Sequence, residues 1–321
     1  MQQISEEDIK EIILKNYIEY QYLFVEFQSK FLSGLYDKYQ CIEKGNLALY
    51  YAKQIHQDIL RQKDYNLNFN ISFEKFWENH HKIKPKRISI TKVASSTSLP
   101  KETARRKILQ LLRQKVLSKE NRKIAWLPNE QYKKNYNLHT IQEIEDVARL
   151  ISFIFKKLNY STSSEVVIRE LKDKFSFYWF HYLGAQLEYL RLWSKQLDDI
   201  ELVLIFLQVA HIFTTKAKKK NLSHQKIFDD PSLLKEFISA SVSSTSISEI
   251  TGIPRATCLR KLGLLVKLKI VSLDEISKRY YISPDVITED LISRKLTKKV
   301  VKLFSNFFFI CLRAINAKTL S

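Results

Sequence analysis

The spacing of apolar residues predicts a chain built mainly from amphipathic helices. Residues Ser5 to Asp8 (SEED) have the form of a helix capping box, and apolar residues recur every three or four positions after it. This pattern predicts one long first helix that ends between Gly34 and Tyr39. A second helix is expected to begin at the cap residue Asn46, and a shorter one is expected over residues 72–82.

The second half of the chain shows the same helical periodicity. Residues 141–158 and 163–175 predict two amphipathic helices, and a long aromatic stretch over residues 177–193 follows them. A basic amphipathic helix is expected over residues 288–318 at the end of the chain. We expect no counterpart of this closing helix in the first half.

Two segments of the chain carry the same pattern 154 residues apart: SLPKETARRKILQLLRQKVLS (Ser98–Ser118) and GIPRATCLRKLGLLVKLKIVS (Gly252–Ser272). Upstream of them, the stretch Asn46–His56 has a loose echo in Glu201–His211. We therefore expect an internal duplication of the chain, with the seam between the two halves at residues 135–140.

Each repeated segment has the pattern of a helix-turn-helix. A short helix ends at Ser98 or Gly252, and Pro100 or Pro254 fits the first position of the next helix, where its missing N–H costs nothing. That second helix has one apolar stripe, which predicts a buried face. The stripe consists of Ala104, Ile108, Leu111, Leu112 and Val116 in the first copy, and of Cys258, Leu262, Leu265, Val266 and Ile270 in the second.

The opposite face of each second helix is predicted to point outward, and a β-hairpin is predicted to follow it. After each helix the sequence gives a short strand, a charged turn and a strand that ends in apolar residues and Pro. The outward positions are Lys101, Glu102, Arg105 and Arg106 in the first copy, and Arg255, Ala256, Leu259 and Arg260 in the second. The basic residues of the hairpins are Arg122, Lys123, Lys278 and Arg279.

This combination resembles the winged helix-turn-helix domains of bacterial transcription regulators of the MarR, IclR, GntR and Crp kind. The resemblance rests on the turn, the Pro, the Thr, the basic pair and the apolar exit into a hairpin. It implies that residues Lys101–Gln114 and Arg255–Lys267 are recognition helices, which enter the major groove of DNA. It also implies that Thr103 and Thr257 lie close to phosphates.

The expected fold is therefore mainly α, an internally duplicated helical bundle plus winged helix-turn-helix, with short β-hairpin wings. The expected divisions are an N-terminal helical region (1–84), a first winged helix-turn-helix (85–135), a second helical region (136–230), a second winged helix-turn-helix (231–285) and a C-terminal basic amphipathic helix (286–321).

The charge of the chain favours a polyanionic partner. The 53 Lys and Arg residues outnumber the 34 Asp and Glu residues, so the formal net charge is +19. Such an excess suits DNA, RNA or an anionic membrane surface, whereas a generally Lys-rich composition is the plain alternative. The chain has only five glycines, which argues against nucleotide-binding and barrel folds that need tight turns.

The sequence contains no pattern typical of catalysis or metal binding. Cys41, Cys258 and Cys311 are far apart, and the seven histidines show no metal-ligand spacing. Nucleotide-binding and nucleophile motifs do not occur in the sequence either. We therefore expect a protein that is not an enzyme and that uses no metal and no cofactor.

Several polar and aromatic residues have more than one reading. Asp198-Asp199 and Asp229-Asp230 are interpreted as helix starts and caps, and His56 and His211 as packing or capping residues. The dense aromatic residues between 177 and 193 are interpreted as core. A subunit interface and a pocket for a small-molecule effector are the alternatives, and a homodimer through the helical regions follows the same logic.

These observations together predict a transcriptional regulator that binds double-stranded DNA in the cytoplasm, associated with the nucleoid. Its two winged helix-turn-helix domains are expected to bind successive major grooves, about 34 Å apart. Because the outward residues differ between the copies, the expected DNA site is non-palindromic. The alternatives are a plasmid-type replication initiator with two winged-helix domains and a winged-helix structural or adaptor protein. No membrane span is expected, because the longest apolar runs, 200–213 and 303–312, are too short.

Overall fold

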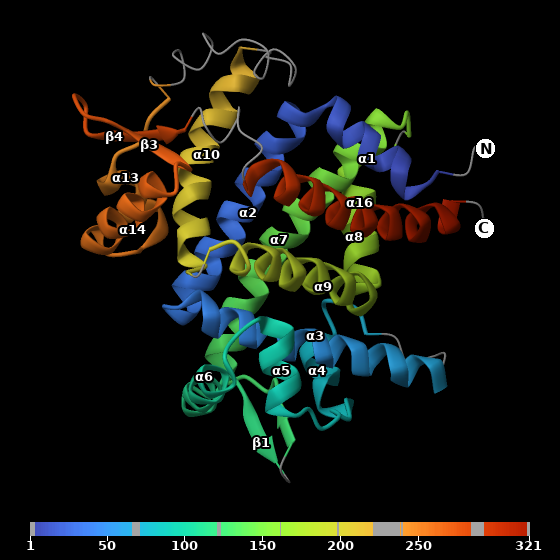
Figure 1. Ribbon diagram of the computed structural model, residues 1–321. Coiled ribbons are helices and arrows are strands. Elements are labelled where there is room, and N and C mark those ends of the chain that lie inside the picture. Colours follow the sequence, from blue (N-terminus) through green and yellow to red (C-terminus); the bar gives the residue numbers. More distant parts are fainter. Residues whose placement is uncertain are drawn as a thin grey trace. The chain divides into compact units, whose positions relative to one another are not determined.

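The computed structural model describes residues 4–65, 71–120, 123–160, 162–197, 199–220, 238, 240–283 and 292–319. These residues form a mainly helical protein with two small antiparallel sheets of two strands each (Figure 1). The mainly α prediction is confirmed. Within the described residues, no helix combines the length and the apolar character that crossing a bilayer requires.

The elements of the first half are α1 (Glu6–Lys15), α2 (Tyr17–Tyr39), α3 (Ile42–Tyr65), α4 (Phe76–Asn79), the 3-10 helix η1 (His80–Lys82), α5 (Ile90–Thr97), α6 (Lys101–Arg113), β1 (Ser118–Glu120), β2 (Lys123–Ala125) and α7 (Glu130–Lys157). Those of the second half are α8 (Ser164–Asp173), α9 (Phe175–Ser194), α10 (Glu201–Lys219), α13 (Ser244–Thr251), α14 (Arg255–Lys267), β3 (Val271–Asp274), β4 (Arg279–Ile282) and α16 (Ile292–Thr319).

Several helices of the two halves have matching lengths. Helices α1 and α8 have 10 residues each, α5 and α13 have 8, α6 and α14 have 13, and α7 and α16 have 28. No counterpart in the first half is expected for the closing helix α16, although α7 has the same length. Helix α7 runs as one continuous helix through the expected seam at residues 135–140.

The predicted single first helix is interrupted at Asn16. Asn16 leaves the helical conformation (φ −111°, ψ 35°), and both its backbone N and its Nδ2 donate to the carbonyl oxygen of Ile12. These hydrogen bonds complete the last turn of α1 before α2 begins at Tyr17. Lys174 leaves the helical conformation in the same way between α8 and α9, with φ −108° and ψ 41°.

The second helix begins earlier than predicted. Gln40 adopts the left-handed conformation (φ 52°) and ends α2, so the chain turns at once into α3, which starts at Ile42. Asn46 is therefore not a cap. It lies buried inside α3, where its Nδ2 donates to the carbonyl oxygen of Thr97 at 3.2 Å.

The chain divides into two compact units, and each contains residues from both halves. Unit 1 consists of Met1–Ile42 and Leu192–Ser305, and unit 2 consists of Glu43–Arg191 and Asn306–Ser321. The five consecutive segments expected from the sequence do not coincide with these units. Each unit contains one pair of short helices followed by a two-stranded hairpin, together with long helices.

In unit 1, α10 packs along α2 (Figure 1). The Nε2 of Gln208 donates to the Oγ of Ser29 at 2.8 Å, and the ring of His211 stacks on that of Tyr22. Almost every residue from Leu202 to Ala210 is buried, which explains why this apolar run shows little helical periodicity.

The core of unit 2 is largely aromatic. Tyr178, Trp179 and Tyr182 of the aromatic stretch in α9 are buried there. His56 belongs to the same core, because its ring stacks on Phe76 and stands edge-on to Phe175, with 5.1 Å between ring centroids in both pairs. Further aromatic members of this core are Phe73, Trp77, His80, Trp126 and Tyr136.

Two buried histidines make the stability of unit 2 dependent on pH. Neither ring nitrogen of His56 has a hydrogen-bond partner among the described residues, and the Nε2 of His80 also has none. Burial lowers the pKa of His56 to about 3 and that of His80 to about 4. Both histidines are therefore neutral in the folded chain and take up a proton near their usual pKa of 6.5 when it unfolds.

The free energy of unfolding is expected to be highest above about pH 6.5 and to fall as the pH drops toward 3, by roughly 1 kcal/mol per pH unit for each histidine. The variant His56→Phe should show a smaller fall, because the group that takes up the proton is gone. Urea unfolding followed by tryptophan fluorescence measures this, with His81→Phe as the exposed control. An equal fall in His56→Phe and in the unaltered chain would contradict the prediction.

Candidate nucleic-acid interface

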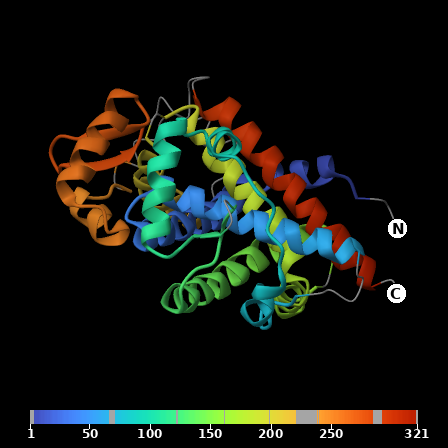
Figure 2. The same ribbon diagram turned by 90° about the horizontal axis from the view of Figure 1, so that it is seen from below.

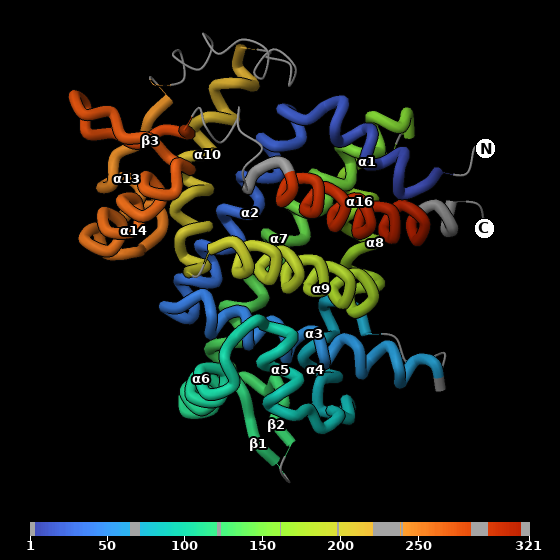
Figure 3. The backbone as a smooth tube through the Cα atoms, viewed as in Figure 1, coloured from blue at the N-terminus to red at the C-terminus, as the bar shows by residue number. Residues whose placement is uncertain are grey.

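Each half of the chain contains two short helices joined by a tight turn, followed by a hairpin. We call residues 89–125 the first module and residues 241–282 the second module. Figure 2 shows the second module, in orange, as one compact group, and Figure 3 shows β1 and β2 of the first module side by side. Both modules are built from the same local signals.

Serine caps and left-handed turns set the geometry of both modules. The Oγ of Ser89 accepts a hydrogen bond from the N of Lys92, and the Oγ of Ser243 accepts one from the N of Ser246, so α5 and α13 are capped alike. At the ends of these helices the chain turns through positive φ, at 55° for Ser98 and at 71° for Gly252.

Proline follows the turn in both modules and starts the next helix. Pro100 and Pro254 occupy the N-cap positions of α6 and α14, one residue earlier than the sequence predicts. Their φ angles, −55° and −53°, are within the range that the ring imposes. Both helices therefore leave the turn in the same way.

The predicted apolar stripes are buried for the most part. Ala104, Ile108, Leu111 and Val116 are buried in the first module, and Cys258, Leu262, Leu265 and Ile270 in the second. Leu112 and Val266 are only half-buried. They lie at the margins of the two buried faces.

The predicted outward residues are exposed in both modules. Thr103 and Thr257 are half-buried beside them. The exposed set consists of Lys101, Glu102, Arg105 and Arg106 on α6, and of Arg255, Ala256, Leu259 and Arg260 on α14.

The lysine that follows each outward arginine points the other way. In α14, the Nζ of Lys261 lies 2.9 Å from a carboxylate oxygen of Glu201 and also pairs with Asp199, and Lys261 is only 3% exposed. In α6, the Nζ of Lys107 lies 2.7 Å from a carboxylate oxygen of Glu43. Each ion pair joins the second helix of a module to the first turn of the long helix α10 or α3 of the same unit.

Sequence reasoning did not find this inward lysine, although a signal for it existed. Lys107 follows the buried Ala104 by three positions and precedes the buried Leu111 by four, which places it on the inner face of the helix. The same spacing relates Lys261 to Cys258 and Leu265. The basic pair of each module therefore divides into one outward arginine and one structural lysine.

Helical geometry places four exposed residues on the outermost ridge of each second helix, at spacings of four, three and four. In α6 these are Glu102, Arg106, Leu109 and Arg113, and in α14 they are Ala256, Arg260, Gly263 and Lys267. We call these sets the outer ridges. Both ridges contain two cationic residues. The residue between them is Leu109 in α6 and Gly263, which has no side chain, in α14.

Gly263 is not required by the packing of the chain itself. A Cβ at this position would meet no atom within 4 Å. A glycine inside a helix costs about 1 kcal/mol relative to alanine. Its use at the centre of an exposed ridge fits a surface that another molecule approaches closely.

The outward arginines differ in whether their guanidinium groups interact with neighbouring side chains. Arg105 lies 3.9 Å from the exposed carboxylate of Glu102, and the Nε of Arg255 donates to the Oγ1 of Thr245 at 3.1 Å. Within the described part of the chain, Arg106 and Arg260 form no hydrogen bond or ion pair. These two side chains are available to an external partner.

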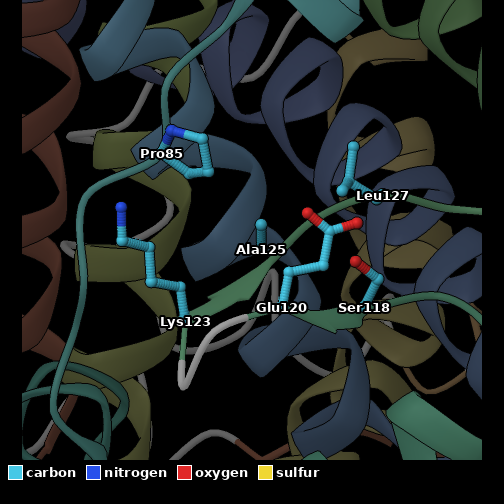
Figure 4. Close-up of a pocket in the computed structure, with 6 residues that line it drawn as sticks. All are labelled: Pro85, Ser118, Glu120, Lys123, Ala125 and Leu127. Carbon is cyan, nitrogen blue, oxygen red and sulfur yellow. The ribbon is translucent and has the colours of Figure 1, made fainter.

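The hairpin of the first module presents Lys123. Strands β1 and β2 pair antiparallel, with Ser118 opposite Ala125, and Lys123 is exposed. Lys123 also lines a small open pocket with Pro85, Ser118, Glu120, Ala125 and Leu127 (Figure 4). Arg122 lies outside the described residues.

Hydrogen bonds to the preceding residues Ser241 and Val242 hold the hairpin of the second module in place. The backbones of Val242 and Tyr280 exchange two hydrogen bonds, of 2.9 and 2.8 Å, beside the β3–β4 pair. The guanidinium of Arg279 donates to the carbonyl oxygen of Ser241, at 2.9 Å from one of its nitrogens. Arg279 is exposed, but its guanidinium helps to hold the hairpin, and its predicted contact with DNA stays a prediction.

At the tip of this hairpin the charge of Lys278 is neutralised by a neighbouring carboxylate, and an apolar side chain is exposed. Lys278 pairs with Glu275 at 2.7 Å. Asp274 accepts hydrogen bonds from Ser277 and from the backbone of Ile276, which lower the pKa of its carboxyl. Ile276 is 95% exposed, and sequence reasoning did not single it out.

The carboxylates and histidines show no metal centre. In the part of the chain that the structure covers, no group of three or more His, Cys, Asp or Glu side chains could hold a metal ion. Asp199 accepts a hydrogen bond from the N of Glu201 at the start of α10, so its reading as a helix-start residue is confirmed. Asp198, Asp229 and Asp230 lie outside the described residues.

Comparisons with known proteins give no further guide to this surface. No protein-family model matches the chain, and searches of curated proteins and of solved structures found no match.

The two inward lysines are expected to contribute unequally to stability. Replacing Lys261 by Ala leaves two partly buried carboxylates without their cation and should lower the free energy of unfolding by about 3 kcal/mol. Lys107→Ala should cost only about 1 kcal/mol, because the Lys107 side chain is 13% exposed, against 4% for Lys261. Urea unfolding followed by circular dichroism measures both changes. Lys267→Ala, on the exposed side of α14, is the control, and an equal loss in Lys261→Ala and Lys267→Ala would refute the structural role.

Proposed function

We propose that this chain is a sequence-specific, double-stranded-DNA-binding transcriptional regulator whose two modules act as non-identical winged helix-turn-helix domains. The observation that carries the proposal is the outer ridge of α6 and α14. Each ridge presents an arginine, Arg106 or Arg260, that forms no ion pair with any described residue, while the next lysine is ion-paired on the inner side of the helix. In this proposal the two halves of the chain arose by internal duplication.

The local geometry of each module supports this role. A helix-turn-helix needs a second helix with one buried face and one face free to enter the major groove. Both α6 and α14 have this division, and each is followed by a hairpin whose residues are partly exposed. In winged helix-turn-helix domains the hairpin is the wing.

The chemistry of the exposed residues suits duplex DNA. The guanidinium groups of Arg106 and Arg260 are able to donate in pairs to the O6 and N7 of guanine, which is the commonest specific contact in the major groove. Ala256 and Leu259 are suited to apolar contact with the methyl group of thymine. Lys101 and Lys123 would contact phosphates.

The differences between the ridges imply different base preferences. Where α6 has Glu102 and Arg105, α14 has Ala256 and Leu259. The first module is therefore expected to prefer base pairs that offer hydrogen-bonding groups at the positions that these residues face. The second module is expected to tolerate or prefer thymine at the corresponding positions. A non-palindromic target site follows from this difference.

A plasmid-type replication initiator with two winged-helix domains is the second candidate. The observation in its favour is that helices of matching length recur in the two halves of the chain, from α1 and α8 to α7 and α16. Selection of bound DNA from a random library distinguishes the two. An initiator would select recurrent repeats found beside a replication origin, whereas a regulator would select sites beside promoters.

DNA binding is expected to depend steeply on salt and on the two unpaired arginines. If the modules together neutralise six to ten phosphates, the logarithm of the binding constant should fall against the logarithm of salt concentration with a slope of roughly −5 to −9. Arg106→Ala and Arg260→Ala should each weaken binding to the selected sequence by roughly 5- to 150-fold, since a good paired contact contributes about 1–3 kcal/mol.

Fluorescence anisotropy with a labelled duplex measures both effects. Arg169→Ala, an exposed arginine on α8, is the matched control and should leave the affinity unchanged. A flat salt dependence, or equal affinities of all three variants for the selected duplex, would rule out the proposed interface.

A further inference from the structure

The exposed side of α16 carries lysines and no acidic residue. Lys295, Lys298, Lys299 and Lys302 are all exposed, and their spacing places them on one side of the helix. None of the 28 residues of α16 is Asp or Glu. We call these four residues the lysine face.

The opposite side of the helix fixes the lysine face toward solvent. Leu296, Val300, Val301 and Phe304 are buried. The ring of Phe304 stands edge-on to that of Phe24 in α2, with 4.7 Å between centroids, and both residues belong to unit 1. Rotating α16 to bring the lysines inward would expose these apolar side chains.

Among the residues that the structure describes, the four lysines have no neutralising neighbour, because none of them forms an ion pair or a hydrogen bond there. Elsewhere on the surface, lysines pair with carboxylates of the same helix, as Lys10 does with Glu7 and Lys133 does with Glu130. Within the described part of the chain, the lysine face therefore concentrates positive charge that no carboxylate pairs with.

Helix α7 differs from α16 in its charge. It has the same length and also follows a hairpin, but it contains Glu130, Glu143, Glu145 and Asp146. Its Asp146 pairs with Arg149. Of these two 28-residue helices, only α16 lacks acidic residues.

We propose that the lysine face of α16 is a second DNA contact, separate from the modules, which binds backbone phosphates without reading the sequence. From Lys295 to Lys302 the helix advances by about 10 Å, and duplex DNA carries roughly six phosphate charges over that length. Lysine is a flexible point charge that suits phosphate contacts that carry no sequence information. The inference rests on the proposed function, because the DNA bound by the modules would supply these phosphates.

An anionic membrane is the less suitable partner. A basic amphipathic helix binds a bilayer by inserting its apolar side among the lipids. The apolar side of α16 beside the lysine face is already buried in unit 1, so only charge is available there to a lipid surface.

The test uses the full chain with all four lysines of the face changed to Gln. The matched control changes four other exposed lysines, Lys15, Lys134, Lys156 and Lys195, to Gln, so that both variants lose the same charge. Anisotropy of a labelled duplex of unrelated sequence gives the slope of log affinity against log salt for each. Co-sedimentation with vesicles of one part phosphatidylserine and two parts phosphatidylcholine tests the membrane.

The magnitude of the slope is expected to fall by roughly 3–4 in the lysine-face variant and by less than about 1 in the control. An unchanged slope, or an equal change in both variants, would overturn the lysine-face contact. Vesicle binding that is lost in the lysine-face variant while its DNA slope stays unchanged would overturn it in favour of a membrane.

A different measurement, the preference for the selected duplex over an unrelated one, tests the proposed function. If Arg106→Ala combined with Arg260→Ala keeps the full preference for the selected duplex over the unrelated one, the modules do not read the sequence, whatever the slope. Absence of duplex binding by the unaltered chain would overturn both proposals.

Discussion

In each module, an ion-paired lysine and the buried apolar stripe beside it fix which side of the second helix faces outward. In α14, the ammonium of Lys261 lies between the carboxylates of Asp199 and Glu201 at the start of α10. Turning the helix would leave this buried ammonium without partners, which costs several kcal/mol. The ion pair of Lys107 with Glu43 plays the same part in α6 at a more exposed site. Because Arg106 and Arg260 precede these lysines, each outer ridge is set by an ion pair on the opposite side of its helix.

The two halves of the chain share this arrangement and differ at exposed positions. The caps, the turns and the buried stripes of the modules agree, whereas the outer ridges differ, with Leu109 in one and Gly263 in the other. The last helices of the halves differ more, since α7 mixes acids with bases and α16 has no acid. The proposed duplication would thus have kept the residues that position the surfaces and changed those that meet a partner.

Local signals in the sequence predicted the modules well, and long-range packing decided the rest. The serine caps, the turns at Ser98 and Gly252 and the buried stripes depend on residues a few positions apart, so periodicity and capping rules were enough. The break at Asn16 and the uninterrupted α7 show that a long helical pattern alone does not fix where a helix stops. The division into units was beyond prediction, because the packing of α2 against α10 joins distant segments and leaves no local trace. The spacing of Lys261 from Cys258 and Leu265 indicates an inward lysine, but its partners Asp199 and Glu201 lie too far away in the sequence to be predicted.

Hydroxyl-radical footprinting on a duplex selected from a random library tests the central claim most directly. If both outer ridges contact DNA, the unaltered chain should protect two separate segments of the duplex. Arg106→Ala should weaken protection of one segment, and Arg260→Ala should weaken protection of the other. A single protected segment that neither substitution changes would contradict the account of two reading surfaces.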